Sequence, residues 1–310
     1  MSTFRHPLAS SVDWIKRRLA VSSTSNTAHC ASPLCTGLEK NWKRLRNRTG
    51  ILLDGKFYCQ LPCLETALIG HLSRLLAAAH PVPPPNRLPL GLLMVARGKL
   101  THLEVRAALE AQRGGGDCKI GDWFEKLGFA TEQDVTAALA LQWGCPVASS
   151  FALTAVDSPG TIPLSILEAF QMLPANYVAA TNTLYLAFGE RVDHAALYAI
   201  EKTLGCRTQP CVAGRKRISR QLESLRQSSR PADVEFVTRD LAEMARITSS
   251  YVSRISPQEL RLSRLGHFIW LRLKARPGAT NLIFDLRSNS LPSHVPPLPS
   301  PSLSRTALAY

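Results

Sequence analysis

Hydrophobic positions at helical spacing occur twice in the middle of the chain, in two segments that copy each other. Residues 90–112 read LGLLMVARGKLTHLEVRAALEAQ, and residues 120–142 read IGDWFEKLGFATEQDVTAALALQ. At an offset of 30 residues the copies share two glycines, a threonine, an Ala-Ala-Leu run and a closing glutamine. A repeated unit this short cannot bury its apolar face alone, so we expect the two copies to pack on each other.

Each copy predicts a helix, a glycine turn and a second, capped helix. Gly98 and Gly128 follow the first helix, at the position of a C-cap glycine. Thr101 opens the second helix, and Glu104 three residues later completes a capping box. The second copy has a weaker version of this box, with an aspartate in place of the glutamate.

Gly91 and Gly121 lie inside the first helix of each copy, where a glycine costs about 1 kcal/mol relative to alanine. We therefore expect something to approach the helix closely there, either a neighbouring helix or a ligand. Because the unit is duplicated, it presents two equivalent surfaces, which suits a ligand or partner that is itself two-fold.

These motifs resemble the MshEN domain, the N-terminal domain of bacterial type II secretion and type IV pilus assembly ATPases of the GspE and PilB kind. That family carries tandem motifs of the form Arg-Leu-Gly, an apolar pair, glycine, a capped helix and glutamine. The resemblance covers residues 87–228, including the stretch from IPLSILEAF onward. It implies a helical repeat packed with a small βαβα subdomain. In some family members the tandem motifs bind cyclic di-GMP.

The resemblance also implies a set of ligand-binding residues. Leucine, isoleucine and phenylalanine side chains would make the apolar contacts, and Arg87 or Lys119 together with Gln112 or Gln142 would make the polar ones. The residues are Arg87, Leu90, Gly91, Leu93, Gly98, Gln112, Lys119, Ile120, Gly121, Phe124, Gly128, Phe129 and Gln142.

The motif arginine is replaced in both copies. Two residues before the glycine stand Pro89 and Lys119, and Arg87 lies two residues too early. Lysine keeps the charge but lacks the planar fork that pairs with guanine. Two interpretations follow: a cyclic di-GMP receptor, or a protein-interaction domain that kept the fold and lost the ligand.

Sequence motifs of catalysis are missing. No GxxxxGK[ST], HExxH or GxSxG pattern occurs, and the eight histidines are scattered. We expect a non-enzyme, which resembles the secretion ATPases only in their N-terminal domain.

Two cysteine pairs, Cys30-x4-Cys35 and Cys59-x3-Cys63, predict a structural zinc site of the zinc-ribbon kind. The segment ILLDGKFYC reads as two strands around an Asp-Gly turn, and an amphipathic helix follows it. A module of about 40 residues has a core too small for independent stability, so a bound metal would stabilise its fold.

Other interpretations of these thiols are four reduced cysteines, a site in which His29 replaces one ligand, and a disulfide framework. The N-terminus does not resemble a signal peptide, so we expect a cytoplasmic, reducing location, which favours metal. We read the remaining cysteines as ordinary small apolar residues: Cys118, Cys145, Cys206 and Cys211.

A net charge of +14 favours acidic partners such as nucleic acid, anionic lipid or a phosphorylated nucleotide. Basic runs occur at 16–18, 40–48, 215–220 and 254–276, and a solvated basic face is the plain alternative for each. The 40–48 run is the best candidate for nucleic acid. No run reaches the length of about 18 apolar residues that a transmembrane helix needs.

The fold class predicted is α+β and multidomain. A helix is expected over Val234–Arg254, followed by strands at Leu260–Leu262, Phe268–Lys274 and Leu282–Leu286 that bury Trp270 and Phe284. The predicted divisions are a poorly ordered N-terminus (1–28), a zinc module (29–79), a proline-rich linker (80–87), the MshEN-like domain (88–228), a small α+β piece (229–287) and a disordered tail (288–310).

The sequence therefore predicts a non-catalytic regulatory or adaptor protein linked to secretion or pilus systems, with cyclic di-GMP as the candidate ligand. The alternatives are a protein scaffold without nucleotide binding and a zinc-stapled nucleic-acid-binding protein.

Overall fold

The computed structural model describes residues 30–35, 50–77, 87–115, 118–148, 151, 160–227, 233–276 and 278–287. Several predictions lie outside the described residues: the ordering of 1–28, His29, the basic runs at 16–18 and 40–48, the linker at 80–86 and the tail at 288–310. Among the helices that are described, none is both long and apolar enough to cross a membrane.

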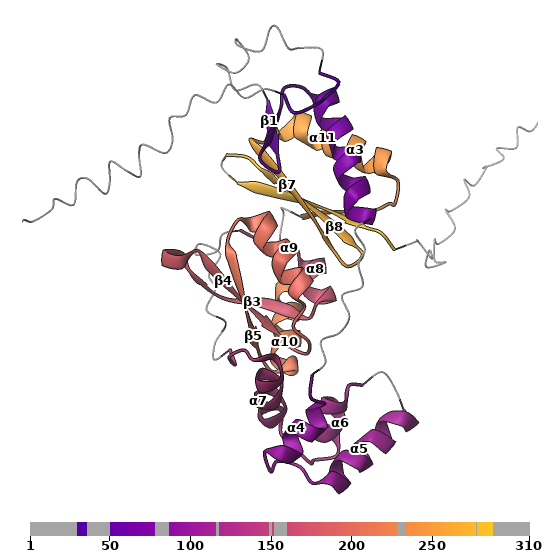
Figure 1. Cartoon of the computed structure of the whole chain (residues 1–310), viewed down its shortest axis with the longest axis vertical. Helices are drawn as coiled ribbons and strands as arrows, with labels where there is room; N and C mark the ends of the chain where they lie inside the picture. The colour runs from indigo at the N-terminus through magenta and orange to yellow at the C-terminus, as the bar shows by residue number, and fades with distance from the viewer. Residues whose placement is uncertain are drawn as a thin grey trace, which may run out of the picture.

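Three bodies follow one another along the long axis of the molecule (Figure 1). The first holds a six-stranded sheet in the order β2-β1-β7-β8-β9-β6, with two helices on one face. Its elements are β1 (Ile51–Leu53), β2 (Lys56–Tyr58), α3 (Leu61–Ala77), β6 (Asp233–Val237), α11 (Leu241–Ile255), β7 (Glu259–Leu265), β8 (Phe268–Lys274) and β9 (Ala279–Asp285).

The middle body is a three-stranded sheet in the order β3-β4-β5, covered by helices. Its elements are α8 (Leu164–Ala169), β3 (Met172–Val178), the short helix η2 (Ala179–Thr181), β4 (Thr183–Phe188), α9 (His194–Leu204), β5 (Arg207–Val212) and α10 (Arg215–Gln227). The predicted βαβα order is present as β4-α9-β5-α10, and β3 adds a strand before it.

The third body is the tandem repeat. Its four helices are α4 (Leu90–Ala96), α5 (His102–Gly114), α6 (Ile120–Lys126) and α7 (Glu132–Trp143). Met94, Ala108, Phe124 and Ala138 form the centre of its small core.

The hairpin β1–β2 turns at Asp54 and Gly55, both of which have positive φ, as an Asp-Gly turn requires. Strand β1 then pairs in parallel with β7, with Leu53 opposite Leu260. The cysteine-bearing segment and the C-terminal piece therefore share one sheet and one core. The sequence predicted the cysteine-bearing segment and the C-terminal α+β piece separately, but not that they form one sheet.

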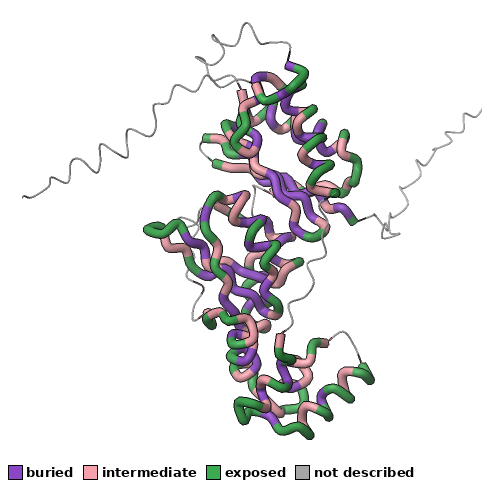
Figure 2. Tube along the Cα trace, in the orientation of Figure 1, coloured by how far each residue is buried: buried purple, intermediate pink, exposed green. Residues whose placement is uncertain are grey.

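Both faces of this sheet are covered. Phe284 packs with α3 and α11 on one face, whereas Trp270 belongs to the core of the middle body on the other. Both side chains are fully buried, which confirms the prediction for them. Figure 2 shows the buried strands lying between helices and the middle body.

The helix predicted over Val234–Arg254 is wrong in its first part. Residues 233–237 form strand β6, paired in parallel with β9, and the helix begins only at Leu241. Asp240 caps this helix by accepting a hydrogen bond from the backbone N–H of Ala242. The alternating residues of DVEFV have the period of a strand, which distinguishes them from the helix that follows.

Candidate metal centre and tandem-repeat surface

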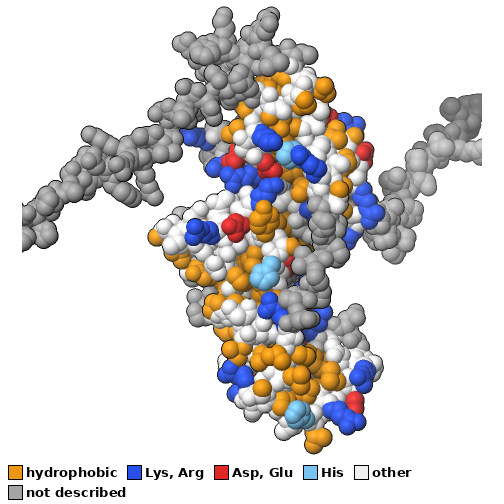
Figure 3. Space-filling model, viewed as in Figure 1, with side chains coloured by type: hydrophobic (Ala, Val, Ile, Leu, Met, Phe, Trp, Pro, Cys, Tyr) orange, Lys and Arg blue, Asp and Glu red, His pale blue; other side chains and the backbone are white. Residues whose placement is uncertain are grey.

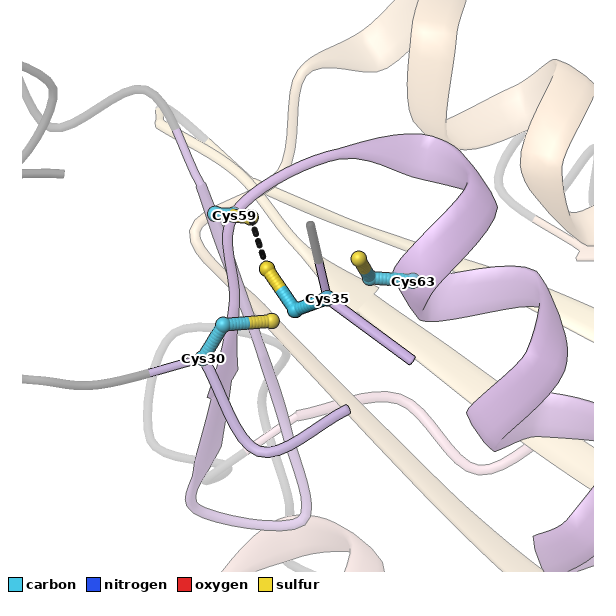
Figure 4. Close-up of side chains that lie close together, drawn as sticks. All are labelled: Cys30, Cys35, Cys59 and Cys63. Carbon is cyan, nitrogen blue, oxygen red and sulfur yellow. Dashed lines mark hydrogen bonds between the residues drawn. The ribbon is translucent and has the colours of Figure 1, made fainter. Parts of the chain in front are cut away.

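Four thiols converge at one end of the first body. Cys30 and Cys35 flank a tight turn, Cys59 follows β2, and Cys63 lies in the first turn of α3 (Figure 4). Their sulfur atoms all lie within 4.8 Å of one another, and the Sγ atoms of Cys35 and Cys59 are 3.5 Å apart. The structure thus brings together all four cysteines that the spacing singled out.

This arrangement fits a tetrahedral thiolate site. Sulfur atoms bound to one Zn²⁺ at about 2.3 Å lie about 3.8 Å from each other. The described thiols need to move by no more than about an ångström to reach that spacing. Three of the four are buried and the fourth is half-buried. Cys35, Cys59 and Cys63 also pack in the hydrophobic core.

The thiols differ in their electrostatic environments. Burial raises the pKa of Cys59 and of Cys63, and hydrogen bonds with neighbouring thiols add to the rise. Burial also acts to raise the pKa of Cys30, but backbone N–H groups of Cys59 and Ser32 donate to its sulfur and hold its pKa below the usual value. Cys30 is therefore deprotonated more easily than Cys59 or Cys63.

Two cysteines of the middle body fit the interpretation as small apolar residues. Burial raises the pKa of Cys206 to about 11 and that of Cys211 to about 12, and both pack in the core of that body.

In the third body, each glycine inside a first helix faces a valine. A Cβ atom added to Gly91 would lie 2.9 Å from Cγ1 of Val105, and one added to Gly121 would lie 2.9 Å from Cγ1 of Val135. The close approach expected at these glycines is therefore made by the second helix of the same copy.

The turn glycines are explained by their backbone conformation. Gly98 and Gly128 have φ of 66° and 71°, the left-handed region in which a helix C-cap glycine lies. Thr101 begins the next helix with the expected capping box. Thr131 and Asp134 make the same two reciprocal hydrogen bonds, so the aspartate version is as complete as the glutamate one.

The closing glutamines tie the two copies together. Nε2 of Gln142, in copy two, donates to the carbonyl of Leu88 at the start of copy one, at 2.6 Å. Nε2 of Gln112, in copy one, donates to the carbonyl of Cys118 at the start of copy two, at 3.0 Å. Because Leu88 and Cys118 are also 30 residues apart, the contacts are reciprocal and give the repeat an internal pseudo-two-fold arrangement.

Arg87 also makes its contacts within the protein. Its Nη1 donates to the carbonyl of Gln142 at 2.6 Å, and its guanidinium lies 3.8 Å from the ring centroid of Trp143. The Nε of Arg87 is buried without a hydrogen-bond partner among the described residues. Arg87 thus joins the start of copy one to the end of copy two.

The remaining predicted ligand residues fall into three groups by burial. Phe124 is fully buried and Leu90 nearly so, which makes both of them core residues. Leu93, Ile120 and Phe129 are half-buried against that core, and Lys119 is exposed. Ligand binding by these residues stays a prediction.

The middle body holds copy two through charged contacts at the first turn of α10. Arg215 pairs with Asp122 at 2.5 Å, and Lys216 Nζ pairs with Glu125 at 2.6 Å. The backbone N–H of Lys216 also donates to Glu132 at 2.9 Å. The start of the 215–220 basic run is therefore paired inside the protein.

Arginines of the 254–276 run have internal partners as well. Arg264 Nη1 donates to the carbonyls of Leu75 and Leu76, the last turn of α3. Arg272 Nη1 donates to the carbonyl of Thr161, which leads into the middle body. The sequence favours a solvated basic face for this run, because nothing local reveals the carbonyl groups that folding brings close to these arginines.

No protein-family model and no curated protein matches this chain. Among solved structures, MshE with cdg is similar at 22% identity over 44% of this chain and 99% of that one, with a TM-score of 0.34. The N-terminal domain of XpsE is similar in two crystal forms, at 20% and 21% identity. These alignments cover 43% and 42% of this chain and 91% and 89% of those chains, with TM-scores of 0.33 and 0.26. The similarity spans less than half of this chain and does not decide what it binds.

Proposed function

We propose that this protein is a non-catalytic adaptor of a type II secretion or type IV pilus type of system, whose tandem repeat contacts a protein. One observation carries the proposal. Arg87, Gln112 and Gln142, three of the four polar groups that the family resemblance assigns to a nucleotide, all bond to the chain's own carbonyl groups. Binding a nucleotide through them would first cost those internal hydrogen bonds.

Exposed apolar side chains in copy one and just before it support a protein partner. Leu88, Leu92 and Leu103 are exposed by 65%, 49% and 78%. Figure 3 shows hydrophobic side chains gathered on the body that holds the repeat. Clustered exposed apolar surface is typical of protein interaction sites.

Purified cytoplasmic components of a type II secretion or type IV pilus system would test the adaptor role. Each component is passed over the immobilised full-length chain in surface plasmon resonance. Saturable binding of at least one component is expected. If every component of both systems fails to bind, the adaptor role is wrong.

Cyclic di-GMP binding is the second candidate, favoured by the exposed cation of Lys119 beside Ile120. Calorimetric titration of the full chain with cyclic di-GMP, with GMP and ATP as controls, separates the two. The adaptor proposal expects no heat at high ligand concentration. Micromolar binding that is lost in Lys119→Ala would instead establish a receptor.

We also propose that Cys30, Cys35, Cys59 and Cys63 hold a structural Zn²⁺. Four thiolates would fill the coordination shell of the metal, so it would supply folding stability and no chemistry. The residues it would join are the turn at 30–35, the end of β2 and the start of α3.

Metal analysis of protein purified without chelator should give about one zinc per chain. Cys59→Ser should lower this stoichiometry, whereas Cys206→Ser, at a buried thiol outside the cluster, should leave it unchanged. Far less than one zinc in the unaltered chain would contradict the metal site.

A further inference from the structure

The two copies of the repeat differ in what covers them. In copy two, Asp122, Glu125 and Glu132 surround the first turn of α10, an amphipathic helix of the same chain. Gly214, just before that helix, lies so close that an added Cβ would be 2.7 Å from Oε1 of Glu132. The surface of copy two that carries these three carboxylates therefore binds the N-terminal end of a helix.

At an offset of 30 residues, the positions of these three carboxylates are Leu92, Val95 and His102 in copy one. Leu92 and His102 are exposed, and Leu103 beside them is exposed by 78%. We call Leu92, Val95, His102 and Leu103 the copy-one face. The backbone that binds the end of α10 in copy two is thus repeated in copy one, where two apolar side chains and a histidine replace the three carboxylates.

We propose that the copy-one face binds the N-terminal end of an amphipathic helix of a partner protein, and that the first turn of this helix is apolar. The proposal rests on the adaptor role and specifies its partner. Leu92 and Val95 stand where copy two has carboxylates, so the occupant has apolar side chains where α10 has Arg215 and Lys216.

His102 completes the match. Its counterpart Glu132 accepts a hydrogen bond from the backbone N–H of Lys216, one of the helix N–H groups without a partner inside α10. A neutral imidazole nitrogen can accept the same kind of bond.

Charge and occupancy argue against a second copy of this chain as the occupant. The α10 of each chain already contacts its own copy two, through Arg215 and Lys216. A second α10 would bring these two cations against Leu92 and Val95, where they would lose water without gaining a carboxylate.

Two peptides based on residues 213–227 test the proposal against the full-length chain. The parent peptide has the sequence AGRKRISRQLESLRQ, and the apolar peptide carries the Arg215→Leu and Lys216→Leu changes. Binding is followed by NMR of labelled leucine and valine methyl groups. The apolar peptide should shift the signals of Leu92, Val95 and Leu103 in a saturable way, and should bind about tenfold or more tightly than the parent peptide.

Leu92→Asp should weaken binding of the apolar peptide about tenfold or more. Leu141→Asp should leave the binding unchanged, because this leucine of copy two is 51% exposed and lies outside both the copy-one face and the contact with α10. Equal binding of the two peptides, shifts elsewhere on the chain, or no saturable shift would overturn the proposal.

Sedimentation velocity of the chain without peptide checks the remaining occupant. A dimer that dissociates in Leu92→Asp would mean that a second copy covers the face, which also overturns the proposal. Peptide binding to the copy-one face without binding of any secretion or pilus component would leave this inference standing and refute the proposed function.

Discussion

Replacing Gly91 by alanine tests whether the repeat glycines exist for helix packing. In a helix interior alanine gains about 1 kcal/mol over glycine, and it gains less at Gly91, the second residue of α4. At Gly91 the added Cβ lies 2.9 Å from Cγ1 of Val105 and 3.5 Å from Phe124. Valine has one strongly preferred rotamer in a helix, so Val105 cannot easily turn away. Overpacking of this kind costs about 1–3 kcal/mol.

The net effect of Gly91→Ala is therefore a loss of about 0–3 kcal/mol in the free energy of unfolding. Gly70→Ala is the matched control, since Gly70 lies in helix α3, is exposed, and has nothing within 4 Å of an added Cβ. This control should stabilise the protein by about 0.5–1 kcal/mol. The two variants should differ mainly by the steric cost, since the propensity gain near the start of α4 is smaller than in the middle of α3.

Urea unfolding at unchanged slope, with hydrogen exchange of amides in α4–α7, measures both variants. Adding Val105→Ala to Gly91→Ala should recover part of the loss, because the smaller side chain leaves room for the new methyl group. If Gly91→Ala stabilises as much as Gly70→Ala, the helix-packing explanation is wrong and a ligand contact at Gly91 becomes the better one.

Three further changes test the contacts between elements. Arg264→Ala should lower stability by about 1–2 kcal/mol and speed hydrogen exchange in the last turn of α3, whose carbonyls it bonds. Asp54→Asn loses the 2.9 Å ion pair with Lys202 but tolerates the positive φ, so in thermal unfolding it should cost less than Asp54→Ala, which adds backbone strain. Hydrogen bonds from Lys99 and Thr131 lower the pKa of Asp134 from 3.8 to about 2. Its stabilising contribution is therefore complete above about pH 4 and lost as the pH falls to about 2, and the stability difference between wild type and Asp134→Asn should shrink over that range.

The sequence predicted the features whose signals are local. The capping boxes, the left-handed glycines and the Asp-Gly hairpin each depend on residues a few positions apart, and the structure shows all of them. The closeness of the four thiols was also predictable, because their two short pairs have the spacing typical of zinc ligands.

Contacts between distant segments could not be predicted in the same way. The pairing of β1 with β7 joins Leu53 to Leu260, and no property of either strand specifies its neighbour. Arg264 caps a helix that ends near residue 77, and Arg87 stacks on Trp143 from the far end of the repeat. A single sequence shows these arginines only as charges, because their partners are backbone carbonyls and a ring brought close by folding.

The parallel pairing of β1 with β7 has a consequence for synthesis of the protein. Residue 53 leaves the ribosome 207 residues before residue 260, the difference between the two paired positions. At about 5–20 residues per second, the first hairpin waits about 10–40 seconds for the strand that completes its sheet. During that time the apolar face of α3 has no β7 or α11 to cover it. A metal captured early by the thiols would hold the hairpin and α3 together through this interval. The proposed zinc site therefore predicts that zinc supply during translation affects the yield of folded protein more than zinc supply afterwards.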